Sequence, residues 1–234
     1  MYFDQLGRVR ACCQNSGTLL GDIGAASIRE VWESASADRL RSALEHDDYG
    51  EGCEFCGWQL AEGNESILFA RDYDEPAPVQ RRPRWPERME FALTNTCNLQ
   101  CVMCNGEWSS AIRSRRERRA PLPAAYGEAF FAELAEFLPH LRKAQFAGGE
   151  PFLGSEPLRV MEMLAALDEP PEVTIITNGT QLTPRVRRIV ERLRPRLIVS
   201  IDGATPATYD RIRVGSHLPD VLANLDAFID LVGP

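Results

Sequence analysis

Three cysteines, Cys97, Cys101 and Cys104, fall within the short segment TNTCNLQCVMCNG. An odd number does not suit a disulfide framework, and a structural zinc site would need a fourth ligand or a histidine. The histidines of the chain lie elsewhere in the sequence. A cubane iron–sulfur cluster is normally held by four thiolates, so three thiolates leave one iron with an open position. A small molecule that carries an amine and a carboxylate would suit that position.

The composition is typical of a soluble globular protein, with 44% hydrophobic and 26% charged residues and a net charge of −8. This charge disfavours general binding to nucleic acid or to a membrane surface, and we expect neither partner. No apolar run approaches the ~20 residues of a membrane span, and the start, MYFDQLGRVRACC, does not resemble a signal peptide. We therefore expect a cytoplasmic protein, in which clustered cysteines are more often metal ligands than disulfides.

The segment RSRRERR, residues 113–119, is an exception to the acidic balance. Two interpretations stay open. We favour a solvated helix face, and the other is a patch that binds phosphate or an acidic substrate.

Four short apolar runs in the second half of the chain predict strands buried on both faces, as in a parallel sheet. Helical patterns separate or follow them, which predicts an α/β layer or barrel with right-handed crossovers. The expected strands are residues 89–95, 143–149, 173–179 and 196–203, and the expected helices are residues 126–141, 156–168, 183–194 and 218–232.

Unusual residues end each of these four strands, and parallel strands place their carboxyl ends on one rim, where ligands bind in α/β folds. The first strand runs into the three cysteines, and the second ends in Gly148, Gly149 and Glu150. The glycines lack side chains, so backbone carbonyls can approach the ammonium group of a ligand, and the carboxylate adds an acceptor. The third strand ends at Asn178 and the fourth reaches Ser200, so four motifs are expected to meet at one site.

The motif Cys-x3-Cys-x2-Cys, followed by GGEP, TNG and SIDGATPATYDRIRVG, resembles the radical S-adenosylmethionine enzymes. The resemblance covers roughly residues 89–234 and implies a partial (β/α) barrel. It also implies a [4Fe–4S] cluster whose open iron binds S-adenosylmethionine. An electron, supplied by a reductant such as flavodoxin or ferredoxin, then cleaves this cofactor to a 5′-deoxyadenosyl radical that abstracts hydrogen from the substrate.

The resemblance also assigns roles by position. By this resemblance the three cysteines are the cluster ligands, and the Gly-Gly-Glu turn binds the amine of the cofactor. Candidates for the cofactor's carboxylate are Ser200 and Arg213, and a weaker candidate for the cofactor or substrate rim is Asn178.

The first 65 residues hold the other four cysteines, Cys12 with Cys13 and Cys53 with Cys56. Residues 27–48 predict one amphipathic helix, and the sequence GRV near the start predicts a tight turn between two short strands. The segment resembles the auxiliary-cluster modules called SPASM or twitch domains. This resemblance implies a second iron–sulfur cluster on Cys53, Cys56 and one of the adjacent pair, with zinc as the alternative.

We expect three parts: an auxiliary module over residues 1–65, a linker over residues 66–88 and a radical core over residues 89–234. About four of the six βα units of the family core are present, which predicts truncation at the C-terminus. The leading hypothesis is an enzyme that modifies a peptide, a protein or a small metabolite, with a lean toward peptides or proteins. The alternative is a non-catalytic metal-binding interaction module on a truncated or degenerate core.

Overall fold

The computed structural model describes residues 1–15, 17–73 and 82–233. Its centre is a parallel sheet of β4 (Arg88–Phe91), β5 (Lys143–Phe146), β6 (Glu172–Thr177) and β7 (Arg196–Val199). These strands pair in chain order, in a register that aligns Phe91 with Phe146 and Phe146 with Ile175. The predicted α/β class with a parallel sheet is confirmed.

Three short strands extend this sheet beyond β4. They are β1 (Tyr2–Phe3), which pairs with β4 in parallel, and the antiparallel strands β2 (Arg8–Arg10) and β3 (Gly21–Asp22). The described sheet has the order β3-β2-β1-β4-β5-β6-β7. The predicted turn between two short strands is confirmed, and Gly7 supplies its positive φ of 83°. The ring of Phe3 stacks on Phe91 with centroids 5.8 Å apart, so the N-terminal segment contributes to the same core as the parallel strands.

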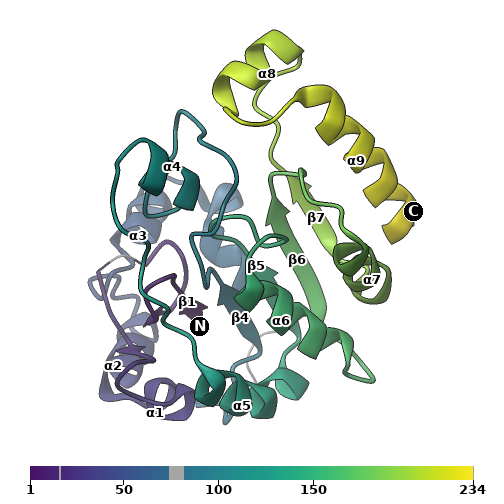
Figure 1. Ribbon diagram of the computed structural model, residues 1–234. Coiled ribbons are helices and arrows are strands. Elements are labelled where there is room, and N and C mark those ends of the chain that lie inside the picture. Colours follow the sequence, from purple (N-terminus) through teal and green to yellow (C-terminus); the bar gives the residue numbers. More distant parts are fainter. Residues whose placement is uncertain (16, 74–81, 234) are drawn as a thin grey trace.

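The helices and 3-10 turns are distributed along the whole chain. Figure 1 shows α1 and α2 at one end of the molecule, with α7 and α9 side by side beyond the other sheet edge. None of the helices in the described residues is long and apolar enough to cross a bilayer. The elements are α1 (Ile28–Trp32), α2 (Ala35–Leu44), α3 (Glu54–Ala61), η1 (Glu65–Ile67), η2 (Phe69–Tyr73), α4 (Ser110–Arg115), α5 (Glu128–Phe137), η3 (Leu138–His140), α6 (Ser155–Ala165), α7 (Pro184–Leu193), α8 (Pro206–Ile212) and α9 (Leu218–Val232).

The single helix predicted over residues 27–48 is wrong, because the chain forms two helices there. The hydroxyl of Ser27 caps α1 by accepting from the backbone N–H of Glu30, and Ser34 caps α2 by accepting from Ala37 at 3.1 Å. Ser34 also donates its hydroxyl to the carbonyl of Leu20 at 3.1 Å. A serine that satisfies backbone groups in this way begins a new helix, which breaks the apparent continuity.

The predicted linker over residues 66–88 contains helical turns before residue 74, namely the end of η1 and all of η2. Its middle, residues 74–81, lies outside the described residues. Its last residue, Arg88, is already the first residue of β4.

Candidate functional site

The loop that carries Cys97, Cys101 and Cys104 follows β4 and is held at several points along its backbone. The N–H of Gln100 donates to the carbonyl of Val214 at 2.8 Å. The N–H of Cys97 donates to the hydroxyl of Ser110 at 3.1 Å, at the start of α4. Cys101 is buried, and Cys97 and Cys104 are half-buried. The loop therefore has a defined path between the parallel sheet, α4 and the C-terminal segment.

The three thiols lie within electrostatic range of one another. Burial raises the pKa of Cys97 to about 11, and the neighbouring Cys101 and Cys104 thiols add to this shift. In residues 1–15, 17–73 and 82–233, no three histidine, cysteine or acidic side chains converge as single-ion ligands. A cubane cluster takes each thiolate on a different iron, so the donor chemistry of Cys97, Cys101 and Cys104 suits such a cluster.

The Gly-Gly turn after β5 packs directly against the backbone before the first cysteine. Gly149 donates its N–H to the carbonyl of Thr94 at 3.1 Å, and Glu150 donates to Thr96 at 2.7 Å. A Cβ atom on Gly149 would lie 2.4 Å from the carbonyl oxygen of Thr96, and Gly148 has a φ of 101°. The chain's own backbone therefore requires these glycines, in addition to any requirement from a ligand.

The carboxylate of Glu150 is fully buried and joins the ends of β5 and β6. Its Oε1 accepts from the N–H of Phe152 at 3.0 Å and from the hydroxyl of Thr177 at 2.7 Å. Its Oε2 accepts from the N–H of Asn178 at 2.7 Å. Burial raises the pKa of Glu150 above its ordinary value, and these three hydrogen bonds oppose the shift. The carboxylate is thus held rigidly at the strand ends.

The side chain of Asn178 faces the cysteine loop. Its Nδ2 donates to the side-chain carbonyl of Asn98 at 3.1 Å and lies 3.9 Å from Sγ of Cys97. Its Oδ1 accepts from the N–H of Thr180 at 2.9 Å. The sequence motifs did not single out Asn98 or Thr180, although Asn98 lies inside the cysteine motif and Thr180 directly follows the TNG motif.

Arg213 and Ser200 come to the same side of the sheet from the C-terminal region. The guanidinium of Arg213 lies with Nη1 3.7 Å from Sγ of Cys101, and its Nε donates to the carboxylate of Asp202. The half-buried Ser200 is positioned by its N–H, which donates to the carbonyl of Thr177 at 2.9 Å. The structure therefore brings the cysteine loop and the ends of β5, β6 and β7 to one rim.

The four N-terminal cysteines separate into two environments. Asn15 contacts Sγ of Cys53 with its Nδ2 at 3.5 Å, and donates its N–H to the carbonyl of Cys12 at 3.3 Å. Cys56 lies in α3 one turn after Cys53. Cys13 is exposed by comparison, whereas burial and then the Glu90 carboxylate raise the pKa of both adjacent thiols.

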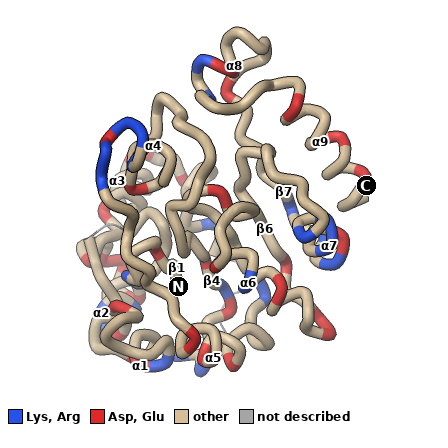
Figure 2. The backbone as a smooth tube through the Cα atoms, in the orientation of Figure 1, with Lys and Arg blue, Asp and Glu red and all other residues tan. Residues whose placement is uncertain are grey.

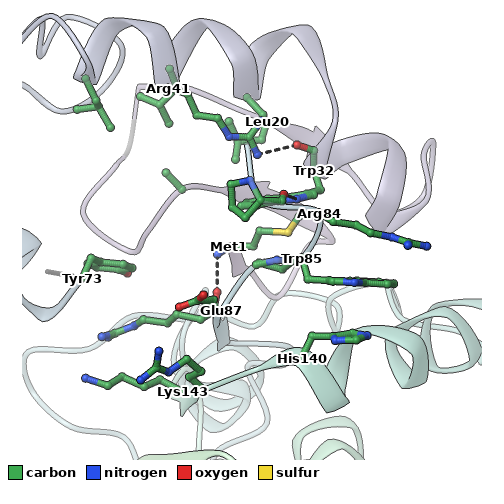
Figure 3. A pocket seen from close by; sticks show the side chains of 18 of the residues that line it. Met1, Leu20, Trp32, Arg41, Tyr73, Arg84, Trp85, Glu87, His140 and Lys143 are labelled. Atoms are coloured by element: carbon green, nitrogen blue, oxygen red, sulfur yellow. Dashed lines mark hydrogen bonds between the residues drawn. The ribbon is translucent and has the colours of Figure 1, made fainter. Parts of the chain in front are cut away.

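A hollow of about 540 Å³ opens beside the cysteine loop and is lined by Thr96, Cys97 and the arginines of α4 and the following loop. A larger hollow of about 1020 Å³ lies where the parallel strands begin, at Arg88 and Lys143. Figure 3 shows Met1, Trp85 and other side chains around it. Its described lining residues include none of the predicted site residues. The smaller hollow lies at the carboxyl end of β4, and Cys97 is the one predicted site residue among its described lining.

The fold and these motifs define the class of protein. The sequence model of the Radical SAM superfamily matches residues 91–233, and the chain belongs to this superfamily.

Curated relatives cover the same region. The chain is 33% identical over 145 residues to the GTP 3′,8-cyclase of Mycolicibacterium smegmatis, with 59% of this chain and 37% of that protein covered. It is 37% identical over 139 residues to the AdoMet-dependent heme synthase of Methanosarcina barkeri, with 55% and 34% covered. The chain thus spans little more than a third of the length of either relative.

A solved structure described as histidine-tagged anSMEcpe with bound AdoMet superimposes with a TM-score of 0.45 at 18% identity. The match covers 62% of this chain and 40% of that one.

Proposed function

We propose that this chain is the radical-generating part of an enzyme that cleaves S-adenosylmethionine reductively. Cys97, Cys101 and Cys104 would hold a [4Fe–4S] cluster. The observation that carries the proposal is the meeting of the cysteine loop with the Gly-Gly-Glu turn, through the hydrogen bond from Glu150 to Thr96. When bound, such a cluster supplies the electron that yields a 5′-deoxyadenosyl radical.

The residues around the thiols have distinct roles in this proposal. Glu150 already accepts three hydrogen bonds from its own chain, so it would orient the turn whose backbone receives the cofactor's ammonium group. Arg213 directs its guanidinium toward the cysteine loop and would bind the cofactor's carboxylate, with Ser200 as the second candidate. Asn178 would position Cys97 through its amide. The half-buried loop limits the access of water to these groups.

We propose a small-molecule substrate. The expectation that leaned toward a peptide or protein rested on the SPASM or twitch resemblance. The names of the two relatives instead refer to GTP and to heme. The electron would come from a reductant such as flavodoxin or ferredoxin. The seven cysteines are free thiols, which suits the reducing cytoplasm.

We also propose a second iron–sulfur cluster on the N-terminal cysteines, in a module of the SPASM or twitch type over residues 1–65. Cys53 and Cys56 would be two ligands. Cys12 is the better third ligand of the adjacent pair, because Asn15 links its backbone to the Cys53 thiol. Cys13 is the more exposed of the two. Residues 66–88 would connect this module to the radical core over residues 89–234.

The test is anaerobic reconstitution of the protein with iron and sulfide. Wild type should form 5′-deoxyadenosine from S-adenosylmethionine under reducing conditions. The triple variant Cys97→Ala, Cys101→Ala, Cys104→Ala should not. Val102→Ala is the matched control, because this side chain is 58% exposed in the same loop and has no thiol. Product formation by the triple variant would contradict the proposal. Wild type without iron or cleavage would favour a non-catalytic interaction module.

A further inference from the structure

The basic segment at residues 113–119 has no role in the proposal above. It contains five arginines and one glutamate, a net charge of +4 in a chain of net charge −8. Figure 2 shows a concentration of Lys and Arg colour at α4 and the loop that follows it, and Ser114 and Glu117 interrupt the run of arginines in the sequence. A second group of arginines lies on α7, on the other side of the molecule. Of these two groups, the first alone is among the described residues that line the hollow beside the cysteine loop.

The chain holds this segment in a fixed conformation. Arg118 has a φ of 53°, which reverses the chain after α4, and the N–H of Arg119 then donates to the carbonyl of Arg113 at 2.9 Å. Glu117 accepts from the N–H of Gly106 at 2.7 Å, which ties the segment to the cysteine loop two residues after Cys104. A solvated helix face would need no such reversal or tie.

The arginines face the hollow with unused hydrogen-bonding capacity. Arg113, Arg115 and Arg119 line it together with Cys97. The Nη1 atom of Arg113 is buried and has no hydrogen-bond partner in the part of the chain that the structure describes. Arg115 forms no ion pair within the described residues, whereas Arg119 pairs with Glu117 at 3.2 Å.

An acidic side chain also lines this hollow. Glu156 lies on the wall and accepts from the hydroxyl of Ser155 at 2.9 Å. Among the described residues that line the hollow, the arginines therefore outnumber the acidic residues.

We propose that this hollow binds the anionic group, phosphate or carboxylate, of the small-molecule substrate. This inference rests on the proposed function, because it places that group beside Cys97 and the radical source. Guanidinium groups bind both anions through paired N–H donors, and a buried unpaired N–H gains most from such a partner. A hollow of about 540 Å³ suits a small ligand, whereas an acidic protein would contact the outer surface of the segment.

The experiment titrates pyrophosphate, and separately citrate, into the cluster-free protein and measures binding by calorimetry. The test variant is Arg115→Gln with Arg119→Gln, which removes two exposed positive charges from the hollow. The matched control is Arg187→Gln with Arg188→Gln, which removes two exposed positive charges from α7. We expect at least tenfold weaker binding in the test variant and unchanged binding in the control. The anion that binds more tightly identifies the substrate group.

Three outcomes would overturn the inference. They are no binding of either anion to wild type, equal weakening in both double variants, and a test variant that keeps its anion affinity but slows reduction by flavodoxin. The last would make the segment a docking surface for a protein. Absence of anion binding in a protein that cleaves S-adenosylmethionine would refute this inference alone. Anion binding without cleavage would refute only the proposed function.

Discussion

The backbone N–H of Asn178 donates to Oε2 of Glu150 at 2.7 Å and thereby joins the ends of β6 and β5. The acceptor carboxylate is fully buried, and the same asparagine directs its side-chain amide toward Cys97. One buried carboxylate thus aligns the Gly-Gly turn with the residues that face the cysteine loop. Because burial raises the pKa of Glu150, this link has a dependence on pH that can be measured.

Lowering the pH should stabilise wild type relative to Glu150→Gln. The pKa of Glu150 is raised in the folded state, so its stabilising contribution is complete below the ordinary value of 4.5 and is lost as pH rises through the folded pKa. Glutamine does not titrate, and the other acidic residues contribute equally to the pH dependence of both proteins, so their contributions cancel in the comparison. Urea unfolding measures the unfolding free energy of both proteins at pH 8 and pH 5. The value for wild type minus the value for Glu150→Gln should be larger at pH 5 than at pH 8. A difference that is equal at both values would contradict the raised pKa.

Gly149→Ala should destabilise the fold by roughly 1–3 kcal/mol, because its Cβ would lie 2.4 Å from the carbonyl oxygen of Thr96. Gly127→Ala is the control, since a Cβ there meets none of the described atoms within 4 Å and its φ of −101° suits any residue. Thermal and urea unfolding of the two variants test this. Equal stability of both variants would mean that the turn relaxes without cost and that the glycine serves a ligand only.

The parallel sheet could be predicted from the sequence because it is built from local signals. Nearly continuous apolar runs such as the one at Ile175 and Ile176 indicate the strands of a parallel sheet, and the polar residues that end them share one rim. The expectation that all four strands are buried on both faces is wrong for the edge strand β7, where Ile198 is 40% exposed. The pairing of β1 with β4 could not be predicted in this way. It joins Phe3 to Phe91, and two or three residues of strand carry too little pattern to show a partner so distant in the chain.

The residue types of the candidate site could be predicted from the sequence, but the contacts between these residues could not. The motifs identified Gly149 and Glu150. The close approach of the Thr96 carbonyl to Gly149, however, depends on how two loops pack against each other. For the basic segment the sequence left a solvated helix face and an anion-binding patch open, because charge alone does not show the positive φ of Arg118 or the hydrogen bond from Gly106 to Glu117. Such long-range contacts come from tertiary structure and leave no periodic signal.

Arg213→Ala should weaken the binding of S-adenosylmethionine to the reconstituted protein by about tenfold or more, since it removes a charge-assisted hydrogen bond to a carboxylate. Arg211→Ala is the matched control, because this exposed arginine lies on α8 two residues earlier. Calorimetric titration of the cofactor into each variant is the measurement. If both variants bind with wild-type affinity, Arg213 serves only its ion pair with Asp202.

The N-terminal cysteines give the last prediction, which separates iron–sulfur from zinc. Cys53→Ala with Cys56→Ala should remove about half of the iron from reconstituted protein, if each cluster holds four irons. Cleavage of S-adenosylmethionine should continue, because the thiols of the radical core are on a different loop. Cys12→Ala should lower the iron content in the same way, whereas Cys13→Ala should keep it, because Asn15 links Cys12 to Cys53 and Cys13 is exposed. Metal analysis of the four proteins after anaerobic purification decides the question. Stoichiometric zinc, or iron that is equal in all four, would show that this segment holds no second cluster.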